Sequence, residues 1–396
     1  MESAIHFQVL AAVFGIAFVL GAVVAKTGFC TMGAVSDWVN IGDTGRLRAW
    51  LLASAVAIAG LTLLEGTAIV SLPADMSPPY RTAEFAWLRY VLGGLIFGVG
   101  MTIGSGCANK TLVRIGGGNL KSVVVFLAIA VVVWLMLVTQ LFNIAFMSWI
   151  APTNIDLSRW QLGGQDLGTI AAALTASDPA YVRGIAGAIV ALALGGFALR
   201  SAGFRHNPDH VLSGVVVGLA VVGGWYLTAG PMGVDWREFA AFAPEPPSRV
   251  TVQSLTFVGP IGDTLRYATA PGQWTLINFG MMAVFGVLAG SLVYSLLARR
   301  FRIEWFTSFS DFLRHLLGGV LMGFGGFLAM GCTIGQGVTG ASTLSVGSFI
   351  ALASIIFGSA LTMKVQYHLL DERGLLHALQ ASFQDLRLLP ASRAAR

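Results

Sequence analysis

The sequence predicts an all-α polytopic membrane protein with about nine transmembrane helices, short re-entrant helices and an inverted pseudo-two-fold repeat. Three observations predict this fold class. Hydrophobic residues make up 56% of the chain and charged residues 11%, roughly half the charged share of an ordinary soluble domain. Apolar runs of about 18–25 residues recur, each long enough to cross a bilayer core of about 30 Å. Finally, part of the first half recurs 225 residues later in the second.

Nine apolar runs are the predicted spans, at about residues 8–25, 47–70, 88–106, 121–149, 182–200, 211–229, 275–298, 314–331 and 345–363. An acidic residue rather than a basic region precedes the first run, and no small-residue cleavage site follows it, so we expect a true span rather than a signal peptide. The spans form one integral membrane transport domain over residues 1–363. We expect residues 364–396 to form a polar, helix-prone cytoplasmic tail at the membrane surface.

The distribution of Lys and Arg predicts the orientation of the chain. If the N-terminus lies outside, 17 of the 24 basic residues fall on the inner side. The other seven are Arg81, Arg89, Arg159, Arg183, Arg237, Arg249 and Arg266. The positive-inside rule therefore favours a periplasmic N-terminus and a cytoplasmic C-terminus. The net charge of +5 is a consequence of this topology, so we expect membrane lipid and no nucleic acid as partner.

The internal repeat relates two spans that run in opposite directions. Arg89 matches Arg314, and Gly106–Cys107 matches Gly331–Cys332. These residues lie in the third and eighth spans, and an odd difference of five makes the two copies antiparallel. We therefore predict inverted halves at about 1–175 and 176–363. Inverted repeats of this kind place the substrate site of a transporter near the bilayer midplane.

The segments that follow the two repeated cysteines are predicted to re-enter the membrane. Cys107 is followed by a short polar stretch, three glycines and Asn119, a plausible helix N-cap. Cys332 is followed by eleven residues without charge, too apolar for a solvated loop. Irregular backbone at membrane depth is tolerated where it lines a polar cavity or is buried. Glycines and helix N-termini expose N–H groups that favour an anion, so we expect both segments to line a pathway.

The chain has only three cysteines, and all of them lie at ends of predicted spans. A single cysteine in an apolar helix is usually a small buried hydrophobe, but this shared placement argues for function. No C-x-x-C, histidine cluster or catalytic serine motif accompanies them, so we predict no metal site, no cofactor and no enzyme activity. The repeat predicts a counterpart of Cys30 near residues 298–303, where no cysteine stands.

These motifs resemble a known family. Gly-Phe-Cys30, Gly-Ser-Gly-Cys107 and Met-Gly-Cys332-Thr-Ile-Gly-Gln in an inverted pair are similar to the YeeE/YedE sulphur-transport family over nearly the whole chain. The resemblance implies nine spanning helices with short helices dipping in from both sides of the bacterial inner membrane. It also implies uptake of a sulfur-containing oxyanion, thiosulfate first, handed inward along the three cysteines.

Thiols suit such a path for physical reasons. A thiol is a weak donor that contacts an anion without holding it tightly, and a free thiol with a pKa of about 8.5 is mostly neutral at pH 7. Conduction needs several weak sites rather than one strong one. The candidate substrate-binding residues are Cys30, Cys107, Cys332, Asn109, Lys110, Arg114 and Gln336.

Several alternatives stay open at this stage. Lys110 and Arg114, four residues apart, are either an anion attractor or positive-inside anchors, and they depart from the thiosulfate carriers of the family. Glu65 either couples protons to transport or hydrogen-bonds a neighbouring helix. The segment 230–274 is a second departure, and we expect it to pack over the outer mouth. These departures leave another sulfur or selenium compound open as the substrate.

A function of another class is also compatible with the cysteines. In a membrane thiol enzyme they would carry persulfide covalently to a cytoplasmic sulfur-carrier protein. A binding or assembly subunit without transport is disfavoured by the polar, glycine-rich segments between spans. Addition of one sulfur atom to a cysteine after exposure to substrate would distinguish the relay from a transporter.

Overall fold

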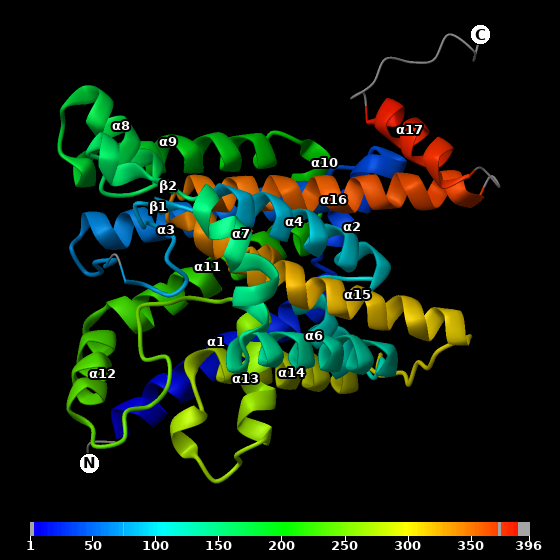
Figure 1. The fold of residues 1–396 in the computed structure, drawn as a ribbon, viewed down its shortest axis with the longest axis horizontal. Helices are drawn as coiled ribbons and strands as arrows, with labels where there is room; N and C mark the ends of the chain where they lie inside the picture. Colours follow the sequence, from blue (N-terminus) through cyan, green and yellow to red (C-terminus); the bar gives the residue numbers. More distant parts are fainter. Residues whose placement is uncertain (1–3, 74, 371–373, 387–396) are drawn as a thin grey trace.

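The computed structural model describes residues 4–73, 75–370 and 374–386, and helices make up most of this part of the chain (Figure 1). The long helices are α1 (Ala4–Thr27), α3 (Gly45–Gly66), α4 (Trp87–Ile103), α6 (Leu120–Val138), α9 (Pro179–Leu199), α11 (Pro208–Ala229), α14 (Phe279–Leu297), α15 (Phe309–Leu328) and α16 (Val346–Leu370). The strands in the described ranges are β1 (Glu84–Phe85) and β2 (Ile155–Asp156), which pair antiparallel. The predicted all-α membrane fold is therefore confirmed.

Shorter helices connect the long ones. The α-helices are α2 (Thr31–Ser36), α5 (Ala108–Gly116), α7 (Ser148–Ile150), α8 (Leu167–Thr175), α10 (Ala202–Arg205), α12 (Pro231–Phe242), α13 (Val258–Ala268) and α17 (Leu375–Asp385). The π-helices are η1 (Asp37–Ile41), η2 (Asn143–Met147) and η6 (Gly335–Gly340), and the 3₁₀ helices are η3 (Ala151–Thr153), η4 (Leu157–Trp160) and η5 (Trp274–Leu276).

Each of the nine predicted spans coincides with one long helix. Eight helical segments in the described residues are long and apolar enough to cross a membrane. The exception is α15, whose first turns carry Asp311 and Arg314 and whose second half is rich in glycine. The fourth span is shorter than predicted, since α6 ends at Val138 and a π-helical segment follows.

The inverted repeat is visible where α4 packs on α15. A Cβ atom added to Gly93 would lie 2.8 Å from the carbonyl oxygen of Gly325, and one added to Gly100 would lie 2.8 Å from that of Gly318. Gly93 is the repeat equivalent of Gly318, and Gly100 of Gly325. The repeat therefore turns the Gly93–Gly325 contact into the Gly318–Gly100 contact. Two copies related by a two-fold axis make paired contacts of this kind. Side chains at these glycines would separate the two helices.

Other helix contacts also occur in matched pairs. If α1, α2, α3, α4 and α6 correspond to α11, α13, α14, α15 and α16, each contact has a counterpart. The α4–α16 contact matches α15–α6, and the α3–α11 contact matches α14–α1. The α2–α3 contact matches α13–α14. This correspondence favours repeat units over residues 4–138 and 208–370. Helix α9, which the sequence placed in the second half, packs on α3 and lies in the connection between these units.

The segment 230–274 contributes a half-helix to the core. It forms α12, an extended stretch and α13, and its Leu255, Phe257 and Ile261 are fully buried. In the matched contacts α13 takes the place of α2, so the counterpart of Cys30, which precedes α2, is Phe257. The expectation of a counterpart near 298–303 was wrong, because those residues follow α14, whereas the helix equivalent to α2 precedes α14.

The predicted C-terminal tail begins inside α16, which continues to Leu370. Helix α17 returns along it, and Asp385 contacts Lys364 at 3.8 Å and His368 at 3.1 Å. Residues 371–373 and 387–396 of the predicted tail lie outside the described residues. The cytoplasmic side of this tail stays a prediction.

Candidate functional site

Two turns of the same backbone geometry precede Cys107 and Cys332. Ser105 has a φ of 62° and Met330 a φ of 58°, both left-handed, and each stands two residues before a cysteine. In both turns the following glycine N–H donates to the carbonyl five residues earlier, at 2.9 Å and 2.8 Å. A left-handed non-glycine residue costs about 1–2 kcal/mol, and such strain concentrates at functional sites.

Each of the three cysteines stands at the start of a short helical segment. Cys30 caps α2, where its sulfur accepts a hydrogen bond from the Gly33 N–H at 3.4 Å. The sulfur of Cys332 accepts one from the Gly335 N–H at 3.4 Å. Cys107 precedes α5 without such a side-chain cap. All three are free thiols, 7%, 0% and 2% exposed in the order named. Of the three cysteine sulfurs, that of Cys107 is the one without a helix-capping hydrogen bond.

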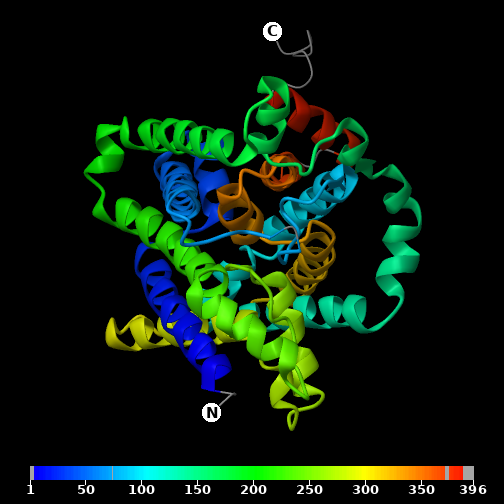
Figure 2. The same cartoon turned by 90° about the vertical axis from the view of Figure 1, so that its left-hand side faces the viewer.

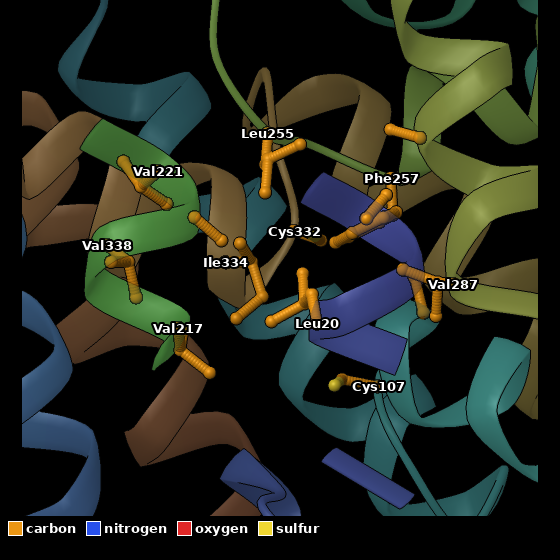
Figure 3. Packing of buried hydrophobic residues seen from close by; sticks show 14 of the residues in the cluster. Leu20, Cys107, Val217, Val221, Leu255, Phe257, Val287, Cys332, Ile334 and Val338 are labelled. Carbon is orange, nitrogen blue, oxygen red and sulfur yellow. The ribbon is translucent and has the colours of Figure 1, made fainter. Parts of the chain in front are cut away.

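Cys107 and Cys332 belong to one buried apolar cluster, and Cys30 lies near Cys107. Cys107 lies within electrostatic range of both Cys30 and Cys332, and beside the side chain of Thr333. Figure 3 shows Cys107 and Cys332 in one apolar cluster, on either side of Leu20. The helices that begin at these cysteines therefore direct their N-termini into the same region. Helix N-termini carry partial positive charge, which stabilises a bound anion.

Two buried polar atoms beside these cysteines lack a strong hydrogen-bond partner among the described residues. Oγ1 of Thr333 and Oδ1 of Asn109 form no hydrogen bond within the described residues, although the two residues are 0% and 2% exposed. Leaving such a group unpaired costs about 1–3 kcal/mol, so each calls for an explanation. Asn109 was predicted as a site residue, and Thr333 was missed. Its position directly after Cys332, equivalent to that of Ala108 after Cys107, is the signal that could have identified it.

Lys110 and Arg114 lie half-buried on α5, close to the turn before Cys107. Arg114 Nη1 donates to the carbonyl oxygen of Ser105 at 2.8 Å. The Lys110 stem packs on Gly106, where an added Cβ atom would lie 3.1 Å from Lys110 Cγ. Neither side chain forms a salt bridge in the part of the chain that the structure describes. Their charge is therefore available beside Cys107, as an anion attractor requires.

Gln336 is held by the protein on both sides of its amide. Its Nε2 donates to the Ala329 carbonyl at 2.5 Å, and its Oε1 accepts from the Ser348 hydroxyl at 2.7 Å. The side chain is fully buried and joins the end of α15 to the start of α16. These bonds favour a positioning role for Gln336, whose place in the substrate site stays a prediction.

The segment after Cys332 is buried along its whole length, from residue 331 to 345. Side chains from elsewhere bond its carbonyl groups: Tyr80 donates to Gly335 at 2.7 Å and Ser54 to Gly337 at 3.0 Å. Irregular backbone at membrane depth needs such partners. Figure 2 shows this orange segment before α16 near the centre of the molecule, so it re-enters the protein as predicted.

Glu65 has a partner that sequence reasoning missed. Its carboxylate forms a two-pronged ion pair with Arg81, at 2.5 Å and 2.8 Å. Arg81 Nε also donates to the Thr343 carbonyl at 3.2 Å. The acid inside α3 is thus tied to the end of the buried segment, which favours the hydrogen-bonding interpretation of Glu65 over proton coupling.

A cavity of about 270 Å³ reaches the Cys332 turn from the end of the bundle where α4 and α14 begin. Its lining includes Arg89, Arg249, Asp263 and Gly331, the residue before Cys332. Arg249 Nε pairs with Asp263 at 2.9 Å, and Arg89 Nε donates to the Leu328 carbonyl at 3.2 Å. The segment 230–274 supplies part of this wall, and its packing over an outer mouth stays a prediction.

Comparison with known proteins places these features in context. The sequence model of a family described as Sulphur transport matches residues 26–361. The thiosulfate transporter TsuA of Escherichia coli K12 is 26% identical over 363 residues, covering 86% of this chain and 89% of that protein. The thiosulfate transporter TsuA of Spirochaeta thermophila is 22% identical over 358 residues, covering 87% and 95%. The family match includes all three candidate cysteines.

Proposed function

Because the chain belongs to the sulphur transport family, we propose that it imports a small sulfur-containing oxyanion, thiosulfate first, across the bacterial inner membrane. The observation that carries this proposal is that Cys107 lies near both Cys30 and Cys332, all three buried at helix starts, with the polar side chains of Thr333 and Asn109 beside them. The curated relatives are named as thiosulfate transporters. The chain has the thiols, the donors and the partial positive charge that such a dianion needs.

The anion first enters the cavity at the Cys332 turn. Arg89 and Arg249 make this mouth attractive to anions, and the Arg249–Asp263 pair limits the net positive charge there. Weak attraction is useful, since a tightly bound ion would not move on. Gly331 leaves space for the anion next to Cys332.

At the centre of the path the substrate contacts thiols rather than charged side chains. The Cys332 and Cys107 thiols donate weakly to its oxygens or terminal sulfur. The Thr333 hydroxyl and, with its amide turned, the Asn109 NH₂ group add stronger hydrogen bonds. Leu20 separates the two cysteines in Figure 3, and an apolar constriction of this kind blocks hydrated ions. Substrate passes when the two repeat units move relative to one another.

The inner part of the path runs from Cys107 to Cys30. Lys110 and Arg114 on α5 draw the anion from the thiols toward the predicted inner face. On this face α5 leads into α6, and α2 leads through η1 into α3. The Lys110 and Arg114 pair has no counterpart after Cys332, where the equivalent positions are Gly335 and Thr339. Gln336 holds the end of α15 to the start of α16.

Uptake of radiolabelled thiosulfate into proteoliposomes tests this function. We expect saturable uptake that sulfate inhibits weakly and other sulfur anions inhibit according to their similarity to thiosulfate. An intact-mass measurement on the same protein tests the persulfide relay. Uptake with unchanged mass supports transport, whereas a gain of one sulfur atom on a cysteine, without uptake, would replace transport with the relay.

A further inference from the structure

Two cavities meet between α3 and α9, away from the cysteine path. The first, of about 640 Å³, lies where α3 ends and α9 begins, and its polar lining residues include Glu65, Tyr181 and Arg183. The second, of about 410 Å³, is lined by Thr62 and by apolar residues such as Ala59 and Ala188. Thr62 lines both cavities. A polar pocket thus continues into an apolar groove along two membrane-spanning helices.

The groove opens toward the lipid phase. Helix α9 packs mainly on α3 and α8, and Figure 1 shows it along one edge of the bundle. Ile185, Ile189 and Leu192 are 45%, 63% and 75% exposed, as expected for a helix face that contacts acyl chains. Tyr181 lies at the polar end and is 70% exposed, in the position that interfacial tyrosines occupy at the level of lipid headgroups.

The charges of the polar pocket match a zwitterion. Glu65 pairs with Arg81, and Arg183 pairs with Asp166 at 2.9 Å, so the four groups have no net charge. Arg183 uses Nε for Asp166 and Nη2 for Thr169, while its Nη1 has no partner among the described residues. This N–H group is available to a phosphate oxygen. The Glu65 carboxylate, 20% exposed, can accept a hydrogen bond from an ammonium group.

We propose that a phosphatidylethanolamine molecule binds here, with its phosphate on Arg183, its ammonium on Glu65 and one acyl chain in the groove between α3 and α9. A phosphatidylglycerol headgroup would satisfy Arg183 but would offer the Glu65–Arg81 pair no ammonium group. The groove accepts a linear apolar chain because small residues line it and Gly195 leaves its wall open, with Ala55 Cβ 3.6 Å from an added Cβ atom.

This lipid site also braces the buried segment after Cys332. Arg81, the partner of Glu65, donates to the Thr343 carbonyl at 3.2 Å. Asp166, the partner of Arg183, is followed in the chain by Leu167. The Leu167 N–H donates to the Leu344 carbonyl at 3.0 Å. Bound lipid would stabilise the Glu65–Arg81 and Arg183–Asp166 pairs, and through them the end of the buried segment after Cys332. The resulting effect on uptake rests on the proposed transport function.

Lipid retention measured by native mass spectrometry tests the site itself. The purified full chain is incubated with phosphatidylethanolamine and phosphatidylglycerol of identical acyl chains, in equal amounts. We expect one phosphatidylethanolamine to be retained in preference. Ala188→Phe, which fills the groove, should weaken retention about tenfold, a difference of about 1.4 kcal/mol. Ala193→Phe, on the same helix but outside the groove, is the matched control and should retain lipid as the original chain does.

Each other result overturns part of the proposal. Equal retention of the two lipids would remove the headgroup assignment, and undiminished retention by Ala188→Phe would remove the groove. If the original chain is a dimer and Ala188→Phe dissociates it, the groove between α3 and α9 is an interface between copies of this chain instead of a lipid site.

Uptake in vesicles with and without phosphatidylethanolamine tests the coupling to transport. We expect thiosulfate uptake to be several-fold slower in phosphatidylglycerol vesicles, and Ala188→Phe to reduce uptake in vesicles that contain phosphatidylethanolamine. Equal uptake in both vesicles would overturn the coupling. Absence of uptake in both would contradict the proposed function, while the retention measurement would still decide the lipid site.

Discussion

The turn before Cys107 and the turn before Cys332 share a backbone, but the segments that follow them differ in charge and packing. After Cys107, α5 carries Lys110 and Arg114 and is half-buried along one side. After Cys332, the chain is uncharged, fully buried and bonded by side chains from other elements. The two copies of the turn thus lead into different surroundings, a charged and partly exposed helix after Cys107 and an uncharged, buried segment after Cys332.

The difference suggests where selection and where release of the anion occur. A neutral wall with an unpaired hydroxyl discriminates by hydrogen bonding, since a substrate that lacks a partner leaves the group unsatisfied. Uncompensated charge attracts any anion and depends on salt. Variants of the two segments should therefore fail in different ways.

The largest effect is expected at the thiol that no cap occupies. Cys107→Ala should nearly abolish thiosulfate uptake while the protein still folds, because removing a small buried group costs modest stability. Ser291→Ala is the matched control, since the Ser291 hydroxyl bonds the Val113 carbonyl of α5 at 3.1 Å and is not among the proposed substrate contacts. Uptake in proteoliposomes and thermal unfolding are measured for both. Near-normal uptake by folded Cys107→Ala would remove the cysteine path.

The next effect concerns the neutral segment. Thr333→Val should weaken uptake by about tenfold or more, because a hydrogen bond to a charged group contributes about 1.5–3 kcal/mol. The same change should leave the melting temperature nearly unchanged, since among the described residues the hydroxyl has no partner stronger than the neighbouring Cys107 thiol.

Thr339→Val is the contrasting variant for Thr333. The Thr339 hydroxyl donates to the Leu255 carbonyl at 2.7 Å, so its loss should lower the melting temperature and affect uptake less. If Thr333→Val destabilised the protein like Thr339→Val and left uptake unchanged, Thr333 would be a packing residue.

A smaller effect is expected in the charged segment. Replacing both Lys110 and Arg114 by Gln should slow uptake several-fold and reduce its dependence on salt, because exposed charges act over a Debye length of about 8–10 Å. Arg299→Gln is the control, a basic residue on the predicted inner face far from the cysteines in sequence. Equal losses for both variants would favour positive-inside anchoring over anion attraction.

The smallest expected difference is in thiol labelling. With an impermeant reagent, Cys332 should react faster from the predicted outer face and Cys107 faster from the inner face, and thiosulfate should slow both reactions. Intact cells and inverted vesicles provide the two faces. Reversed preferences would invert the predicted orientation, and no reaction on either face without denaturant would identify the cysteines as core residues.

The sequence by itself determined the features that depend on local composition. Span length and hydropathy predicted all nine long helices, since crossing a membrane requires a continuous apolar run. The Gly-Cys repeat predicted the antiparallel pair α4 and α15, and the lack of charge after Cys332 predicted that this segment re-enters. The family followed from the same short motifs, and the match over residues 26–361 confirmed it.

Only the tertiary structure decided which distant residues meet. Arg81 and Thr343 are 262 positions apart, and no local pattern relates Arg81 to Glu65 or to the buried segment. Phe257 replaced the expected counterpart of Cys30 because a proline-rich stretch folds into a half-helix when the core covers it. No local pattern distinguishes the Thr333 hydroxyl, which has no strong partner among the described residues, from the Gln336 amide, which is bonded on both sides. Hydrogen-bond satisfaction is a property of packed groups, so the sequence named candidates and the fold assigned their roles.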